Sequence, residues 1–429
     1  MIYQRVIFIY MLMDFSVTNY GPFRDKVTLS AMKTKYCEHP ENVMGTSPRK
    51  VLSSLIIFGP NASGKSYLLK GMAALRGLLR QPNTRNEMIE EYDPFRFSET
   101  TVKSPTEFEI CLDIDGSAYI YTIAFDRHRI RYEALKRLKR NEYFIFERKD
   151  DSFVINGGFS DMDKSVVRRF SENDDGKGII NVSEKTTFNT PYLTVAASFN
   201  DELCNKIYGE IMGMVVIRDR RTQRILMNGI NGLWEDEGGK ALFFNALKAA
   251  DFDITDIRED EVLGDRDVDA LAFRSRRIAN TISVEHNHQE IPSELRWLPL
   301  EKESEGTRSM ILILGPIIRA LKNGGTIIVD EFGSSLHPIL TRHILELFKS
   351  EFNAGGAQLI VNSHDVDLMD IESLFRRDQI YFVNKNRDTG ASELYSLSDF
   401  KGVRKDMDVK KAYLQGRFDA IPNMVSNRR

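Results

Sequence analysis

The segment Gly59–Ser66 has the residue types and spacing needed to hold a phosphate chain. It fits the pattern of a glycine, four variable residues, a second glycine, a lysine and a serine or threonine. Glycines let the backbone curl so that its N–H groups point at phosphate oxygens. The Lys65 ammonium can neutralise the terminal phosphates, and the Ser66 hydroxyl can ligate Mg²⁺. We therefore predict ATP and Mg²⁺ as cofactors, with the nucleotide held by Gly59, Pro60, Asn61, Ala62, Ser63, Gly64, Lys65 and Ser66.

Two carboxylates, Asp330 and Glu331, follow the apolar run 325–329, which reads as a strand. Ligands bind at the carboxyl ends of parallel strands, and this is where a nucleotide-hydrolysing sheet carries its metal and water groups. Asp330 is the predicted Mg²⁺ ligand beside Ser66, and Glu331 is predicted to orient the attacking water. An ordinary exit from strand to loop would look the same. The phosphate loop earlier in the chain favours the catalytic interpretation.

Two further groups could reach the phosphates. Ser304 and Gly306 precede an apolar helix and could point donors at an anion, although a plain helix cap would also explain them. His364 follows the apolar strand 358–362 and could contact a γ-phosphate, although a lone histidine there is usually a polar loop residue. We predict that Lys65, Glu331 and His364 are catalytic.

The elements that position these residues can be read from the hydrophobic pattern. Residues 55–58 are a strand, and the helix after the loop carries apolar residues at helical spacing to Leu79. From residue 95 to about 155 the period becomes two, with a hairpin turn at Asp115-Gly116, which predicts an antiparallel meander. Residues 191–216 are expected to be helical, and residues 233–250 and the region from Asp265 are expected to be mixed and partly helical. The α/β pattern returns from about residue 300 to 385.

The chain therefore reads as an α/β protein with a split core. We predict an N-terminal lobe at 1–95 and a C-terminal lobe at 300–385, with a β-meander and helical region inserted at 96–299. Residues 386–429 are predicted to be a charged tail. Length and composition suit two or three globular domains, or one large α/β domain with another inserted in it.

The order of these motifs resembles ABC-type P-loop ATPases of the structural-maintenance-of-chromosomes and overcoming-lysogenisation-defect kind. The opening Phe15–Phe23 is similar to their first strand pair, and Ser335–Pro338 and the strand ending at His364 follow in their order. The resemblance extends to the bacterial abortive-infection ATPases of the RloA/AbiL type, whose tail is similar to Ala412–Pro422. It covers nearly the whole chain and implies an anti-phage ATPase.

The resemblance also implies partners. It implies a homodimer or higher oligomer in which each ATP lies between Lys65 and Ser66 of one chain and Ser304 and Gly306 of the other, and Ser335–His337 would cross the dimer plane. The output would come from a separate effector, nuclease-like or RloB-like. Three features depart from the family: residues 304–307 are a loose signature, the glutamine that usually senses Mg²⁺ has no clear counterpart, and no long coiled-coil arm is visible.

Charge and cysteine content limit the other classes of function. The net charge of −3 gives no global basic field, so any DNA site must be local. Three separated cysteines favour a reducing cytoplasm over a disulfide framework. The apolar run 6–13 is much too short to span a bilayer, so no membrane association is expected. Met11 and Met13 are candidates for the natural start of translation, with residues 1–10 as a leader without structure.

Local basic clusters leave a DNA-binding alternative open. One cluster lies on the meander and the other follows residue 217, and both could track a phosphate backbone or be solvated faces. A DNA-repair or chromosome-associated ATPase is therefore the alternative function, while a transporter subunit is less favoured. Asp406 and Asp408 lack the context of a metal nuclease. The basic residues are Arg127, Arg129, Arg131, Lys136, Arg137, Lys139 and Arg140, then Arg218, Arg220, Arg221 and Arg224.

Overall fold

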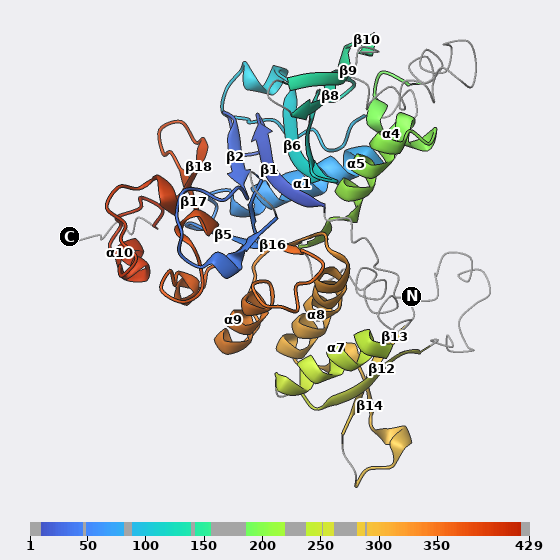
Figure 1. The fold of residues 1–429 in the computed structure, drawn as a ribbon, viewed down its shortest axis with the longest axis vertical. Coiled ribbons are helices and arrows are strands. Elements are labelled where there is room, and N and C mark those ends of the chain that lie inside the picture. The colour runs from blue at the N-terminus through green and yellow to red at the C-terminus, as the bar shows by residue number, and fades with distance from the viewer. Residues whose placement is uncertain are drawn as a thin grey trace. The chain divides into compact units, whose positions relative to one another are not determined.

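The computed structural model describes residues 10–45, 49–80, 88–138, 142–155, 186–218, 237–250, 252–260, 281–287 and 290–421. The chain forms two compact units (Figure 1). The first comprises residues 1–218, 320–334 and 342–429, and the second comprises residues 219–319 and 335–341. These boundaries differ from the predicted lobes, because the meander and the N-terminal strands share one sheet, as described below.

The first unit contains a six-stranded sheet in the order β11-β15-β16-β5-β17-β18. All neighbours are parallel except β17 and β18, which form an antiparallel pair. Strand β5 pairs with β16 from more than 300 residues later in the chain, so the core is split as predicted. The mixed α/β fold class is confirmed. The strands are β5 (Ser54–Phe58), β11 (Val215–Ile217), β15 (Thr326–Val329), β16 (Gln358–Asn362), β17 (Ile380–Lys385) and β18 (Ser392–Ser396).

A seven-stranded antiparallel sheet, in the order β10-β9-β8-β7-β6-β1-β2, belongs to the same unit. The predicted meander is its larger part, and its first turn uses positive φ at Asp115 and Gly116, as the sequence indicated. Because N-terminal β1 pairs with β6, this part of the chain is not a separate inserted body. The strands are β1 (Met11–Thr18), β2 (Val27–Ser30), β6 (Thr106–Ile114), β7 (Ser117–Phe125), β8 (Ile130–Leu138), β9 (Glu142–Lys149) and β10 (Ser152–Ile155).

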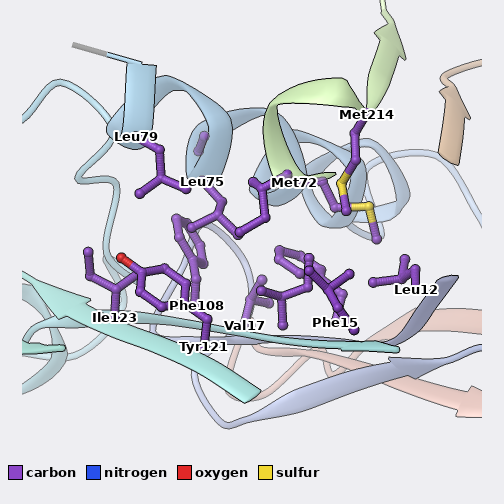
Figure 2. Close-up of a cluster of buried hydrophobic side chains, with 14 of the residues drawn as sticks. Leu12, Phe15, Val17, Met72, Leu75, Leu79, Phe108, Tyr121, Ile123 and Met214 are labelled. Carbon is purple, nitrogen blue, oxygen red and sulfur yellow. The ribbon is translucent and has the colours of Figure 1, made fainter. Parts of the chain in front are cut away.

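Helix α1 (Lys65–Arg80) packs its apolar side against this sheet (Figure 2). Its buried Met72, Leu75 and Leu79 meet Phe15 and Phe108 of the strands in one hydrophobic cluster. Each fully buried side chain of this size contributes about 1.5–3 kcal/mol to stability. The cluster therefore fixes the helix that begins at the phosphate loop.

The region 191–216 is not one helical stretch, which corrects the prediction. It contains α4 (Tyr192–Ser198) and α5 (Glu202–Gly213), separated at Asp201, whose carboxylate caps α5 by accepting from the Cys204 N–H at 2.6 Å. The last residues form β11, because their β-branched side chains pair in register with β15. This strand is the edge strand of the core sheet, next to β15, which ends just before Asp330.

The predicted charged tail is folded as far as residue 421. Its β18 pairs with β17, and α10 (Val409–Leu414) follows. Tyr413 and Phe418 stack on Phe382 of β17, with ring centroids 5.6 and 5.2 Å away. Asp408 caps α10 by accepting from the Lys411 N–H at 2.8 Å. Asp408 therefore has the ordinary role of a helix cap. Among the described residues no group of three or more acids, histidines or cysteines could hold a metal.

The second unit contains α7 (Glu237–Ala249) and a three-stranded antiparallel sheet of β12 (Ile254–Asp260), β13 (Thr281–His286) and β14 (Trp297–Pro299). The expectation of a mixed, partly helical region from Asp265 falls on 265–280, outside the described residues. From residue 281 the chain is a strand. Helix α8 (Glu305–Asn323) begins in this unit.

The remaining elements are short. No helix in the described parts of the chain is long and apolar enough to cross a membrane. The elements are α9 (Pro338–Leu347), β3 (Val43–Met44), β4 (Val51–Leu52) and 3₁₀ turns at Pro40–Asn42, Thr101–Lys103, Ser293–Leu295, Leu300–Lys302, Val366–Leu368, Arg377–Gln379 and Leu397–Asp399.

Candidate functional site

The phosphate loop connects β5 to α1 in a conformation that requires its glycines. Gly59 and Gly64 have φ of 151° and 114°, in the region that disfavours side chains. A Cβ at Gly59 would lie 2.2 Å from the Val383 carbonyl oxygen, and one at Gly64 would lie 2.8 Å from Pro22. The loop is thus held between β17 and the turn after β1, with Asn61 and Ala62 exposed at its tip.

Lys65 lies at the buried end of the loop. Its ammonium donates to the carbonyls of Gly59 and Pro60 at 2.7 and 2.9 Å, and the residue is 5% exposed. Burial lowers the pKa of Lys65 to about 8, against the opposing effect of the nearby Asp330 and Glu331 charges. A cation buried with neutral carbonyl partners is poorly satisfied, so an anion in the loop would gain a strong interaction with it.

Ser66, at the start of α1, contacts Asp330, which follows the carboxyl end of β15. The Ser66 hydroxyl donates to Asp330 Oδ1 at 2.8 Å, although the two residues are 264 positions apart. The amide of Asn362, at the end of β16, donates to the same oxygen at 2.6 Å and lies 3.4 Å from the Ser66 hydroxyl. A hydroxyl and a carboxylate are hard oxygen donors of the kind that Mg²⁺ prefers, so the pair fits that ion.

Asn362 also fixes the residue after Asp330. Its side-chain oxygen accepts from the Glu331 N–H at 2.5 Å. Glu331 has φ of +55°, which is unusual for a residue with a side chain, and its carboxylate is exposed. Strained backbone of this kind is concentrated at functional sites. The amide of Asn362 therefore positions both carboxylates, and sequence reading missed it because an asparagine at a strand end has no distinctive pattern.

Two adjoining cavities give this cluster room for a ligand. Lys65, Ser66, Glu331 and His364 line a cavity of about 950 Å³. A second cavity, of about 1340 Å³, shares His364 and the loop tip and extends to the turn between β17 and β18, residues 384–390. Small-molecule sites usually have volumes of about 300–1,000 Å³, so the space is adequate for a nucleotide.

His364 is exposed at the rim of both cavities. Partial burial lowers the pKa of His364, and the charge of Lys65 lowers it further. The imidazole is therefore biased toward its neutral form at neutral pH, in which one ring nitrogen can donate and the other can accept.

Ser304 and Gly306 lie in the second unit and are described apart from this cluster. The Ser304 hydroxyl accepts from the Thr307 N–H at 3.1 Å, as the cap at the start of α8. A Cβ at Gly306 would lie 3.0 Å from the Ser335 carbonyl oxygen, and Ser335 donates to Glu305 at 3.2 Å. The loop that contains Ser335 thus contacts the start of α8, and no side chain larger than glycine fits easily there.

The basic cluster on the meander is largely paired with acids. Arg129 contacts Asp151 at 2.7 Å, Arg131 contacts Asp126 at 2.6 Å, and Lys136 contacts Glu142 at 2.9 Å. These ion pairs reduce the positive potential that would attract a nucleic acid. Lys139, Arg140, Arg220, Arg221 and Arg224 lie outside the described residues, while Arg127 and Arg137 are described.

Comparison with protein families decides the classification. The profile described as "AAA domain, putative AbiEii toxin, Type IV TA system" matches residues 54–181 and 233–370, more than half of the chain. The chain belongs to this AAA family. None of the curated proteins compared with it matches.

The AAA domain also matches solved structures at low similarity. The SMC head domain from Thermotoga maritima is 14% identical, with a TM-score of 0.36 over 90% of this chain and 98% of that chain. An SMC head bound to the C-winged helix domain of ScpA is 11% identical, with a TM-score of 0.41 over 90% and 97%. The recombination mediator RecF bound to ATP is 14% identical, with a TM-score of 0.38 over 92% and 100%.

One prediction arises directly from this geometry. Replacing Asn362 with leucine keeps most of the side-chain volume but removes both amide contacts, so Asp330 loses its positioning partner. Loss of such a partner typically weakens metal affinity about 10- to 100-fold. We expect Asn362→Leu to need correspondingly more Mg²⁺ for nucleotide turnover, measured by Mg²⁺ titration. Asn205→Ala, at an exposed position on α5, is the control and should leave the Mg²⁺ midpoint unchanged.

Proposed function

We propose that this AAA domain binds ATP with Mg²⁺ and hydrolyses it to ADP and phosphate. The contact of Ser66 with Asp330, braced by Asn362 beside the buried Lys65, is the observation that supports this proposal most strongly. Ser66 and Asp330 would hold the ion, which would neutralise charge on the phosphates. Lys65 would bind the terminal phosphates, Glu331 would orient the attacking water, and His364 would lie beside the γ-phosphate.

A phosphate-release assay on the purified chain tests this function. We expect ATP turnover that depends on added Mg²⁺ and stops with a chelator, because without the ion the carboxylates of Asp330 and Glu331 would repel the phosphates. Binding of ATP with no release of phosphate under any divalent ion would contradict hydrolysis. The absence of binding would contradict the nucleotide site itself.

We further propose that ATP joins two chains. In this arrangement Ser304 and Gly306 of one chain complete the site that contains Lys65 of the other. The tight approach of Gly306 to the loop at Ser335 supports a shaped surface at the start of α8.

Mixing two inactive variants provides that test. A Lys65→Ala chain and a Ser304→Arg chain should each be inactive, but their heterodimer would retain one intact composite site. We expect partial recovery of ATPase activity on mixing. If heterodimers form, shown by differently tagged chains, and activity does not return, the nucleotide site is built within one chain.

The cellular role that we propose is regulation of a separate effector in anti-phage defence. The family description names a toxin of a type IV toxin–antitoxin system, which supports a defence role over a transport role. The alternative, a DNA-binding repair or chromosome-associated ATPase, gains little from the basic residues described, since Arg129, Arg131 and Lys136 are paired. Steeply salt-dependent binding of duplex DNA would revive that alternative.

A further inference from the structure

Arg218 follows β11 at the same edge of the core sheet as Asp330. Strand β11 runs parallel to β15, with Ile217 opposite Val329, and the Asp330 N–H donates to the Ile217 carbonyl at 2.8 Å. The two strands therefore end together, and the next residue of each is Arg218 or Asp330. The Arg218 Nε atom lies 4.0 Å from Asp330 Oδ2.

The two oxygens of Asp330 have different neighbours. Oδ1 accepts from Ser66 and Asn362, while Oδ2 faces the Arg218 guanidinium. The distance of 4.0 Å is an ionic contact without a directed hydrogen bond. The Arg218 side chain is 37% exposed, against 9% for Asp330, so the arginine is the partner with room to move.

Asp330 also connects Arg218 to the phosphate loop. The Ser66 hydroxyl, at the end of that loop, donates to Asp330 Oδ1 at 2.8 Å, while Arg218 lies 4.0 Å from Oδ2 of the same carboxylate. The guanidinium therefore lies beside the pair of residues that we expect to hold Mg²⁺ and the phosphates.

We infer that Arg218 binds the terminal phosphate of ATP and so distinguishes ATP from ADP, an inference that rests on the proposed ATPase function. A divalent cation at Asp330 would weaken the attraction between Oδ2 and the guanidinium, and so would free Arg218 to turn toward another anion. The γ-phosphate would be such an anion, and the planar fork of a guanidinium matches two phosphate oxygens. ADP has no such group, so Arg218 adds nothing to its binding.

Nucleotide titrations of variants test this role. The parent is Glu331→Gln, in which ATP should persist, and the probes are ATP and ADP with Mg²⁺, followed by calorimetry. We expect Arg218→Gln to weaken ATP binding about tenfold or more, the usual effect of losing a hydrogen-bonded charge, and to leave ADP binding unchanged. Arg218→Lys keeps the charge but not the planar fork, so its affinity for ATP should lie between those of the parent and of Arg218→Gln. Arg127→Gln, at an exposed turn of the meander, is the control.

The outcomes separate this inference from the proposed function. If Arg218→Gln loses affinity for ATP and ADP equally, the arginine only positions Asp330. If it loses affinity for neither nucleotide, the arginine does not contact the nucleotide. Either result overturns the inference. A parent that binds neither nucleotide would instead overturn the proposed function, and the role of Arg218 with it. Thermal unfolding of each variant confirms that the fold is kept.

Discussion

Replacing Glu331 with glutamine is expected to slow ATP hydrolysis by about 100- to 10,000-fold, the usual contribution of a positioned general base. The change removes the negative charge that orients and polarises the attacking water while keeping the size of the side chain. Glu331 follows Asp330, shares a cavity with Lys65 and is held at φ of +55° by the amide of Asn362. ATP binding should change little, because the phosphates are held by other residues.

Single-turnover hydrolysis of ATP by Glu331→Gln and by the unmodified protein measures this effect. Glu351→Gln is the matched control, since that carboxylate is exposed after α9. The control should hydrolyse ATP at the rate of the unmodified protein. If Glu331→Gln also hydrolyses ATP at that rate, Glu331 is not the group that activates water.

Replacing Lys65 with alanine is expected to weaken ATP binding by about 100-fold or more, since a buried charge that binds phosphate through several hydrogen bonds is lost. The ammonium is the charge at the closed end of the loop, 2.7 Å from the Gly59 carbonyl. The structure offers Lys70 as a matched control on the same helix, where its ammonium lies 3.4 Å from Asp93.

Titration calorimetry with ATP distinguishes these two lysines. Lys70→Ala should bind ATP as the parent does, because its ion pair is partly exposed and worth little. If Lys65→Ala retains parental affinity, the phosphate loop does not hold the nucleotide in the orientation proposed here.

Elements whose formation depends on nearby residues could be predicted from the sequence. The strand, glycine loop and helix at 55–79 are an example, because each glycine and apolar position acts within a few residues of itself in the chain. The meander could be predicted because its period of two and the turn at Asp115-Gly116 are local features. The pairing of β5 with β16 was indicated only by the order of the motifs.

Long-range contacts explain what the sequence did not predict. Val215–Ile217 continues an apolar helical pattern, and only its pairing with Ile327–Val329 makes it a strand. That strand ends just before Arg218 and so places Arg218 beside Asp330, 4.0 Å from its carboxylate. Likewise, the boundary predicted at residue 95 follows a change of period, while the pairing of Phe15 with Ile110 joins both sides in one sheet.

Aromatic packing explains the tail in the same way. Residues 386–421 are rich in charge, which suggests a solvated segment. Tyr413 and Phe418 are nevertheless buried against Phe382, and this contact between distant residues holds the segment on the core sheet. Composition alone does not reveal which few aromatic side chains will find partners.

The position of the metal in a nucleotide complex tests the central claim most directly. Crystals of Glu331→Gln with ATP and Mn²⁺ in place of Mg²⁺ would give an anomalous scattering peak at the metal. The account predicts one such peak per chain between the Ser66 hydroxyl and the Asp330 carboxylate, with the phosphates in the loop Gly59–Ser66. A peak elsewhere with that loop empty would contradict the assignment of this cluster as the ATP site.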